Sequence, residues 1–414
     1  MVKVCIVFLS RHLTEPGNAM PAAVIVDAVR SPMGRGRPGG ALSDVHPVDL
    51  LAAVLTALLD RTGIDPGTVD DVLVGCAGQA GEQSATPGRQ AWLAAGLPEH
   101  VPSVTIERKC GSGQQALDFA VQGVVAGAYE TVVAAGVESM SRVPMGSARL
   151  GADPFGAGVA RRYAPGLLPQ GIAAELVARK WQLSREALDA YAARSHERAA
   201  KAVADGAFAR ETVPITTPHG VVSADETIRP GTTPEGLAEL PAAFAGSGYH
   251  RRFPDLDFKI TAGNASQLTD GAAALLVMSE ERAAALGLTP RGRIVASAVC
   301  GDDPLLMLTG PLPATRRVLY RSGLTLDDIA AAEVNEAFAS VPLAWQAEFG
   351  FPDDRLNPRG GAIALGHPLG ASGARLATTL LGHLEDTGGR YGLQTMCEAG
   401  GMANALVLEN LGAP

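Results

Sequence analysis

The chain repeats one pattern of landmarks in its two halves. L-L-D-R-T-G at 58–63 is matched by V-L-Y-R-S-G at 318–323, and Asp70-Asp71-Val72 is matched by Asp327-Asp328-Ile329. Further along, Ser112-Gly113 has its counterpart in Ser372-Gly373. One common offset relates the first and the last of these matches, 58–63 with 318–323 and Ser112 with Ser372, which is the signature of an internal duplication.

Each Ser-Gly pair opens an alanine-rich stretch, at 114–128 and 374–384, which predicts two related helices. An apolar run follows each helix, at 131–135 and 393–396, and predicts a strand. The pattern therefore indicates an α/β protein built from two stacked βα-rich halves, with both helix starts directed at a shared centre.

A chain of 414 residues is too long for one ordinary core. We expect an extension at 1–19, a first domain from 20–139 with 262–289, a different domain at 140–261, and a last domain at 290–414. The inserted region carries fifteen Lys/Arg against thirteen Asp/Glu, whereas acidic residues exceed basic ones in the rest of the chain. A basic insert favours an anionic ligand such as a phosphorylated cofactor; a solvated loop face is the alternative.

Composition excludes several classes of protein. The net charge of −9 argues against a general binder of nucleic acid or anionic membranes. No stretch is apolar enough to span a membrane. The five cysteines are scattered and show neither a disulfide framework nor zinc spacing, so we expect no metal site and a reducing, cytoplasmic location.

Three reactive side chains lie among small residues: Cys110 in K-C-G-S-G, His367 in A-L-G-H-P-L-G and Cys397 in M-C-E-A-G-G. A thiol at a helix N-terminus is expected to have a lowered pKa, and an imidazole placed opposite is expected to act as its base. Cys397 is a candidate acid/base. Each has a structural alternative, because buried cysteines are commonly packing residues and lone histidines are commonly structural.

Asn335, in V-N-E-A-F-A, ends a predicted strand. An asparagine here is interpreted either as a turn former or as a group that positions a water or an oxyanion.

Together these segments resemble the thiolase family from Met20 onward. The carrying motifs are C-G-S-G at 110–113, T-A-G-N-A-S at 261–266, N-E-A-F at 335–338, G-G-A-I-A-L-G-H-P-L-G-A-S-G-A-R at 360–375, and the Cys397 loop. The resemblance implies the thiolase fold, with α-β-α-β-α layers and a loop domain that binds coenzyme A (CoA). It also implies a homodimer or homotetramer.

By this resemblance Cys110 carries the acyl group, His367 deprotonates it, and Cys397 is the acid/base at the substrate α-carbon. Asn335 would hold an oxyanion-stabilising water, and the backbone N–H of Ala399 would contribute to an oxyanion site. The implied CoA contacts are Ser266, Ala337, Phe338 and Arg229. The resemblance also implies that no cofactor is permanently bound and that CoA is a substrate.

Three positions depart from the family pattern. Ala399 stands where glycine is usual, so a methyl group borders the acyl site. Met145 stands where acetoacetyl-specific members carry histidine, which favours longer or bulkier acyl chains. Gln267 also stands where glycine is usual.

The expected activity is thiolysis of 3-ketoacyl-CoA to acetyl-CoA or propionyl-CoA and a shortened acyl-CoA, in fatty-acid or steroid degradation. The alternatives are an acetoacetyl-CoA-forming thiolase, a decarboxylating ketosynthase, and a non-catalytic acyl-CoA or sterol binder. Cys397 argues against the ketosynthase, and the retention of all three reactive side chains argues against the binder.

Overall fold

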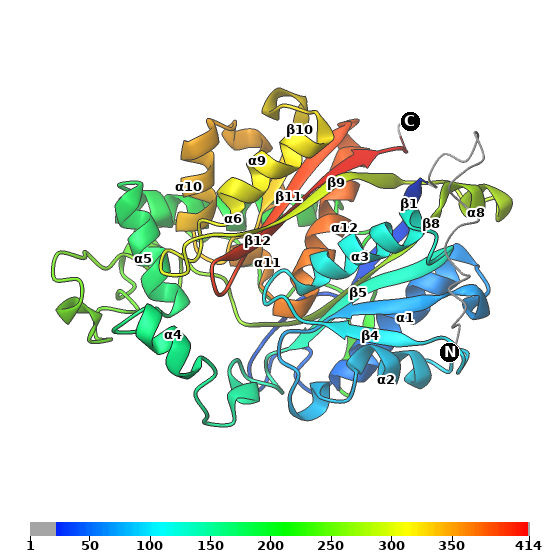
Figure 1. The fold of residues 1–414 in the computed structure, drawn as a ribbon, viewed down its shortest axis with the longest axis horizontal. Helices are drawn as coiled ribbons and strands as arrows, with labels where there is room; N and C mark the ends of the chain where they lie inside the picture. Colours follow the sequence, from blue (N-terminus) through cyan, green and yellow to red (C-terminus); the bar gives the residue numbers. More distant parts are fainter. Residues whose placement is uncertain (1–21, 413–414) are drawn as a thin grey trace, which may run out of the picture.

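The computed structural model describes residues 22–412 and confirms the duplication in its strand pairing (Figure 1). In each half, two strands run parallel and two further strands join them antiparallel. In the first half these strands are β3 (Asp71–Gly75), β5 (Thr131–Ser139), β8 (Thr269–Ser279) and β1 (Ala23–Arg30). Their counterparts in the second half, in the same order, are β10 (Ile329–Val334), β11 (Tyr391–Glu398), β12 (Met402–Asn410) and β9 (Gly292–Gly301).

The two halves are also joined at one edge, which the sequence did not indicate. The strand order is β10-β11-β12-β9-β1-β8-β5-β3-β4, with β4 (Ser103–Ile106) at the edge of the first half and β2 (Gly34–Arg35) paired with β8. The β1–β9 junction consists of the pair Ile25 and Gly292. The halves are therefore stacked and meet along a narrow seam.

Two buried helices fill the space between the halves: α3 (Ser112–Val125) and α12 (Leu369–Thr387). One apolar cluster combines residues of both helices with the inner faces of both sets of strands, including Leu117, Val132, Leu380 and Leu406. Because side chains alternate along a strand, Val133 faces the other way, into a second cluster. This alternation produces the layered arrangement.

Outer helices cover both exposed faces. α1 (Pro47–Thr62) and α2 (Pro87–Ala94) pack on the first half, with α8 (Glu280–Ala285) at its end. α9 (Pro311–Ser322) and α10 (Ser340–Phe349) pack on the second half, and α11 (Ala362–Leu365) precedes α12. The result is an α-β-α-β-α stack.

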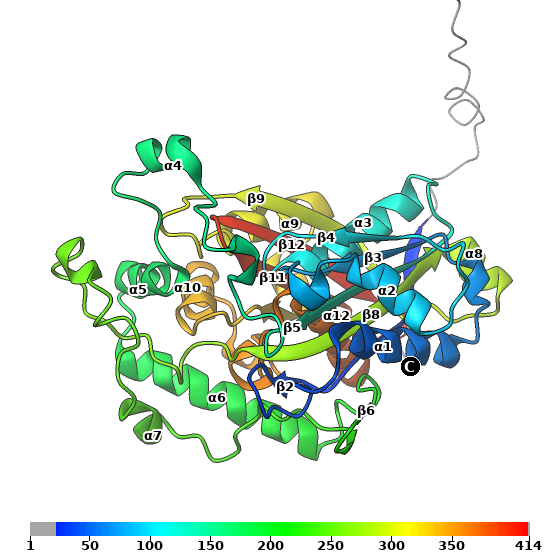
Figure 2. The ribbon, with the colours of Figure 1, turned by 90° about the horizontal axis from the view of Figure 1, so that it is seen from below.

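The inserted region extends to one side of the stack (Figure 2). It contains α4 (Gly156–Arg162), α5 (Gln170–Lys180), α6 (Arg185–Ala204), β6 (Ile215–Thr217), β7 (Gly220–Val222) and α7 (Pro234–Ala238). α5 and α6 are separate helices, because Gln182 between them adopts φ 54° and the Ser184 side chain caps α6 by accepting from the Ala187 N–H.

A buried arginine fixes this region to the core. Arg30, at the end of β1, has no exposed surface and donates to Glu211 at 2.6 Å and to Asp225 at 2.7 Å. Neighbouring carboxylates compensate a buried cation, so removal of one partner is costly.

No helix within residues 22–412 is long and apolar enough to cross a membrane. Cys76, Cys110, Cys300 and Cys397 are all free thiols. The extension predicted at 1–19 lies outside the described residues.

Substitution Gly373→Ala is expected to destabilise the protein by about 1–3 kcal/mol, because overpacking forces the backbone to move. A Cβ at this position would lie 2.2 Å from the backbone nitrogen of Gln114 on the facing helix. Denaturant unfolding followed by circular dichroism checks this. Gly158→Ala, where no atom lies within 4 Å, is the matched control. Equal stability of the two variants would contradict close helix contact.

Candidate active site

The fold brings Cys110, His367, Asn335 and Cys397 into one buried cluster. Cys110 lies just before α3, His367 in the turn between α11 and α12, and Cys397 near the end of β11. All four side chains are at most 4% exposed. Asn335 hydrogen-bonds to the Cys397 thiol and lies 3.4 Å from His367, measured from Nδ2 to Nε2.

A tight turn presents Cys110. Lys109 adopts φ 48°, and the Ser112 hydroxyl accepts from the Arg108 N–H at 2.8 Å and donates to the Lys109 carbonyl at 2.6 Å. Gly111 then passes so close to β11 that a Cβ would lie 1.9 Å from Glu398 Oε1. This contact accounts for the glycine that follows the cysteine.

The hydrogen bonds of His367 define its tautomer. The Ser372 hydroxyl donates to the Pro368 carbonyl at 2.9 Å, so at the 2.6 Å contact Nδ1–H of His367 must be the donor. Nε2 is therefore an unprotonated acceptor that faces the Asn335 amide. Burial lowers the pKa of His367 to about 3, and Arg375 contributes to this effect.

The expected low pKa of the Cys110 thiol is wrong. Burial raises the pKa of Cys110 to about 12, and the charge of Glu398 adds to the rise. Hydrogen bonds from the Gln170 side chain and from the backbone of Cys110 oppose it without overcoming desolvation. The resting site therefore contains a neutral thiol and a neutral imidazole.

Cys397 and its neighbour Glu398 are also held neutral. Burial raises the pKa of Cys397 well above its usual range, with added repulsion from Cys110 and Glu398, while the Asn335 hydrogen bond lowers it. Burial raises the pKa of Glu398 to about 8 despite the nearby charge of Arg108. The Cys397 thiol and the Glu398 carboxyl therefore each carry a proton that can be transferred.

The Asn335 side chain has one amide atom without a protein partner in the described chain. Its backbone N–H donates to the Thr395 carbonyl at 3.0 Å, which fixes the residue at the end of β10. Oδ1 is buried and has no protein hydrogen-bond partner within residues 22–412. Ala399 follows the cluster as a partly buried residue packed against the core of the second half.

The four residues predicted to contact CoA form a second group. The Ser266 N–H donates to the Ala337 carbonyl at 3.0 Å, and Phe338 pairs with Ala265. Arg229 Nη2 donates to Gln267 Oε1 at 3.0 Å. These segments adjoin the turn of His367, whose N–H donates to the Gln267 carbonyl at 3.1 Å.

Met145, interpreted from the sequence as favouring longer or bulkier acyl chains, is 63% exposed and does not belong to the buried cluster. The side chain that reaches the Cys110 sulfur is instead Gln170, the first residue of α5. Sequence reasoning also missed Ser372 and Glu398. Glu398 could have been found from the sequence, because it directly follows Cys397. No residue near Gln170 in the sequence indicated that Gln170 lies beside Cys110.

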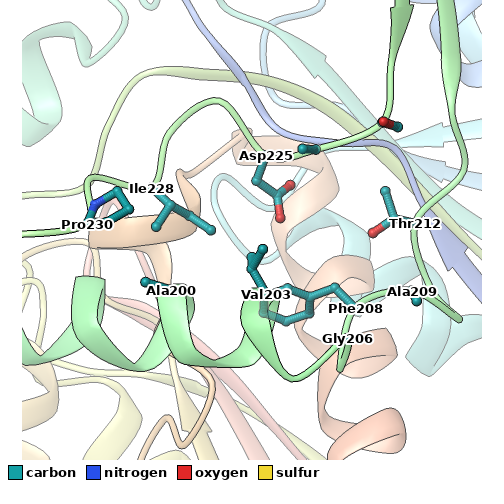
Figure 3. Close-up of a pocket in the computed structure, with 11 residues that line it drawn as sticks. Ala200, Val203, Gly206, Phe208, Ala209, Thr212, Asp225, Ile228 and Pro230 are labelled. Carbon is teal, nitrogen blue, oxygen red and sulfur yellow. The ribbon is translucent and has the colours of Figure 1, made fainter.

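A cavity of about 340 Å³ lies apart from this cluster, between α6 and the segment 223–230 (Figure 3). Ala200, Val203 and Phe208 line it on one side, and Asp225, Ile228 and Pro230 on the other. None of the four clustered residues lines it. Among the described residues, no group of three or more His, Cys, Asp or Glu side chains is placed to hold a metal ion.

Comparison with known proteins identifies this arrangement. Residues 23–281 match the thiolase N-terminal domain, and residues 288–410 match the thiolase C-terminal domain. The chain therefore belongs to the thiolase family, whose members are acyltransferases.

Two curated relatives align over nearly their whole length. The chain is 45% identical to the steroid 3-ketoacyl-CoA thiolase FadA6 of Mycobacterium tuberculosis, over 95% of this chain and 96% of the relative. It is 47% identical to the 3-oxoadipyl-CoA/3-oxo-5,6-dehydrosuberyl-CoA thiolase of Escherichia coli, over 95% and 100%. The crystal structure of the acetyl-CoA acetyltransferase of Bacillus anthracis superposes with a TM-score of 0.84 at 38% identity, covering 95% of this chain and 100% of that one.

The charge state of Cys110 can be measured by the ultraviolet absorbance of thiolate. The difference between wild type and Cys110→Ala is expected to be near zero at about pH 7 and to grow only toward about pH 11, because the raised pKa keeps the thiol protonated below it. Cys300→Ala provides the control difference for another thiol. A thiolate signal at neutral pH that Cys110→Ala removes would contradict the neutral resting pair.

Proposed function

We propose that the protein cleaves 3-ketoacyl-CoA with free CoA, giving acetyl-CoA or propionyl-CoA and a shortened acyl-CoA. The observation that carries this proposal is the buried cluster of Cys110, His367, Asn335 and Cys397, which combines a nucleophile, a base and a second proton carrier. The relative described above that is a steroid 3-ketoacyl-CoA thiolase supports the same reaction.

Acylation begins with proton transfer from the Cys110 thiol to Nε2 of His367 as the sulfur attacks the 3-keto carbon. Because both groups are neutral at rest, the transfer accompanies the attack rather than preceding it. The bond between C2 and C3 then breaks, and the departing enolate receives a proton at carbon from Cys397. Free CoA next attacks the thioester on Cys110 and gives its thiol proton to the Cys397 thiolate. The bond between the acyl carbon and the Cys110 sulfur breaks, His367 returns its proton to that sulfur, and the shortened acyl-CoA leaves.

Negative charge develops on oxygen at each step, so donors aimed at that oxygen lower the barrier. Asn335, through a bound water, and His367 are assigned to the enolate oxygen. The backbone N–H groups of Cys110 and Ala399 are assigned to the oxygen of the acyl-enzyme. The buried amide of Asn335, held by its backbone bond to β11, suits this role.

CoA is assigned to the segments that carry Ser266, Ala337, Phe338 and Arg229, with the cation of Arg229 meeting an anionic group. Within this assignment CoA acts as a substrate, with no permanently bound cofactor and no metal. The backbone bonds between the Ser266 and Ala337 segments support a shared wall.

The acyl group is proposed to be longer or bulkier than acetoacetyl, as in fatty-acid or steroid degradation. The steroid thiolase relative supports this class. Gln170, whose side chain hydrogen-bonds to the Cys110 thiol, is proposed as a further contact of the acyl chain near the reacting carbon. Acetoacetyl-CoA synthesis is the second candidate, favoured by the acetyl-CoA acetyltransferase that shares the fold.

We also propose that the protein forms a homo-oligomer and is located in the cytoplasm. Among residues 22–412, β4 pairs with β3 on one side only, and Val104 on this edge strand is 44% exposed. Leu93 and Phe119 are further large apolar side chains exposed on the first half. An unpaired strand edge and exposed apolar side chains suit pairing with a second copy of the chain.

Wild type is expected to thiolyse members of a panel of 3-ketoacyl-CoAs, from acetoacetyl to long-chain and steroid-derived thioesters. Cys110→Ala is expected to lower kcat by about 10⁴-fold or more, since no other side chain replaces the nucleophile. Loss of the CoA-thioester absorbance measures the rate, and Cys300→Ala serves as a control. Silence of wild type across the panel would favour the binding-only alternative. A preference for acetoacetyl-CoA would favour the second candidate.

Cys397→Ala is expected to form the acyl-enzyme but to lose exchange of the substrate α-proton by about 10²-fold or more, because general acid–base catalysis typically contributes that much. Mass spectrometry of the intact protein detects the acyl-enzyme, and deuterium uptake from heavy water into acetyl-CoA measures exchange. Undiminished exchange would remove Cys397 from the proton-transfer role.

A further inference from the structure

Gln267 joins its own segment to two others from different parts of the chain, 227–229 and 363–367. Its Nε2 donates to the carbonyls of Thr227 at 2.8 Å and Ile363 at 2.9 Å, and its Oε1 accepts from Arg229 Nη2 at 3.0 Å. Its backbone carbonyl accepts from the His367 N–H at 3.1 Å. The residue therefore contacts both the proposed CoA-binding arginine and the turn of the proposed base.

The amide is fully used in these contacts. A glutamine side chain has two N–H donors and one carbonyl acceptor, and here both donors and the acceptor have partners. Ile363 lies in α11, four residues before His367, whereas Thr227 lies two residues before Arg229. The side chain thus fixes the distance between the arginine segment and the histidine turn.

The arginine segment borders a cavity. Ile228 and Pro230 flank Arg229 and line the cavity of about 340 Å³ opposite Ala200 and Val203 of α6 (Figure 3). Ile228 also packs against an apolar cluster of residues from α6 and α11, so the backbone of the segment is held in part by packing. The exposed guanidinium is held by its hydrogen bond to Gln267 at 3.0 Å, and the Arg229 N–H donates to His196 Nδ1 at 3.1 Å.

The chemistry of an amide suits this position better than that of a carboxylate. Arg229 is exposed and has no carboxylate within salt-bridge distance in the part of the chain that the structure describes. A neutral partner orients the guanidinium and leaves its positive charge for an external anion. A glutamate would neutralise that charge and would face the Thr227 and Ile363 carbonyls without donors.

We propose that Gln267 is a positioning residue that holds Arg229 for the anionic groups of CoA and ties that contact to the turn of His367. This inference rests on the proposed function for its assignment of CoA to Arg229. The proposed effect is selective. The side chain affects an acyl acceptor that has phosphate groups, whereas the backbone carbonyl that accepts from the His367 N–H is present whatever side chain stands at position 267.

The test compares two acyl acceptors in the thiolysis assay, CoA and pantetheine, which has the same thiol arm without the phosphates. Gln267→Leu is expected to raise the KM for CoA about tenfold, the size of one charge-assisted contact, and to change kcat and the pantetheine reaction less than about twofold. Gln267→Glu is expected to weaken CoA at least as much. Gln90→Leu, an exposed glutamine on α2, is the matched control.

Arg229→Gln completes a double-mutant cycle with Gln267→Leu. Since Gln267 is proposed to act through Arg229, the double variant is expected to lose about as much CoA affinity as Arg229→Gln alone. Equal losses for CoA and pantetheine, or additive losses in the cycle, would overturn the proposal.

Calorimetric titration with CoA alone separates this inference from the proposed reaction. If wild type binds CoA and Gln267→Leu weakens that binding about tenfold, the positioning role holds whether or not any 3-ketoacyl-CoA is cleaved. If the reaction proceeds but Gln267→Leu binds CoA as wild type does, the role of Gln267 is wrong and the reaction stands.

Discussion

Backbone contact between α3 and α12 is the constraint on which the rest of the structure depends. A Cβ at Gly113 would lie 2.7 Å from the Gly370 carbonyl oxygen, and one at Gly373 would lie 2.2 Å from the Gln114 nitrogen. Two helices can approach this closely only where side chains are absent. Their contact places the turns of Cys110 and His367 together at the centre of the molecule.

Burial at that centre then determines the chemistry. Desolvation raises the pKa of Cys110 to about 12 and lowers that of His367 to about 3, so the charged pair is unfavourable and the neutral pair is the resting state. A helix N-terminus is a weaker influence than the loss of water. The site therefore holds its protons until a substrate supplies an oxygen on which charge can develop.

Much of the fold was predictable because it repeats. The offset between Ser112 and Ser372 predicted both central helices, and apolar runs predicted β5 and β11. The junction between β1 and β9 could not be predicted, because it consists of the single residue pair Ile25 and Gly292, which produces no repeating pattern in the sequence. Gln170 comes from the inserted region, where contacts depend on tertiary packing. The sign of the Cys110 pKa shift was wrong because burial cannot be read from a helix start.

The duplication has a consequence in the two carboxylates that it relates. The offset between Ser112 and Ser372 also relates Glu138 to Glu398, so both occupy the same place in their halves. Glu138 accepts from the N–H of Gly370 at 2.8 Å in the opposite half, whereas both oxygens of Glu398 are buried without a hydrogen-bond partner in the described chain. In the first half the glutamate therefore has a structural role, because Glu138 connects the two halves by a hydrogen bond. In the second half the Glu398 carboxyl lies without a hydrogen-bond partner in the described chain, beside the two thiols. The symmetry between the halves is therefore broken at the place where the chemistry is proposed to occur.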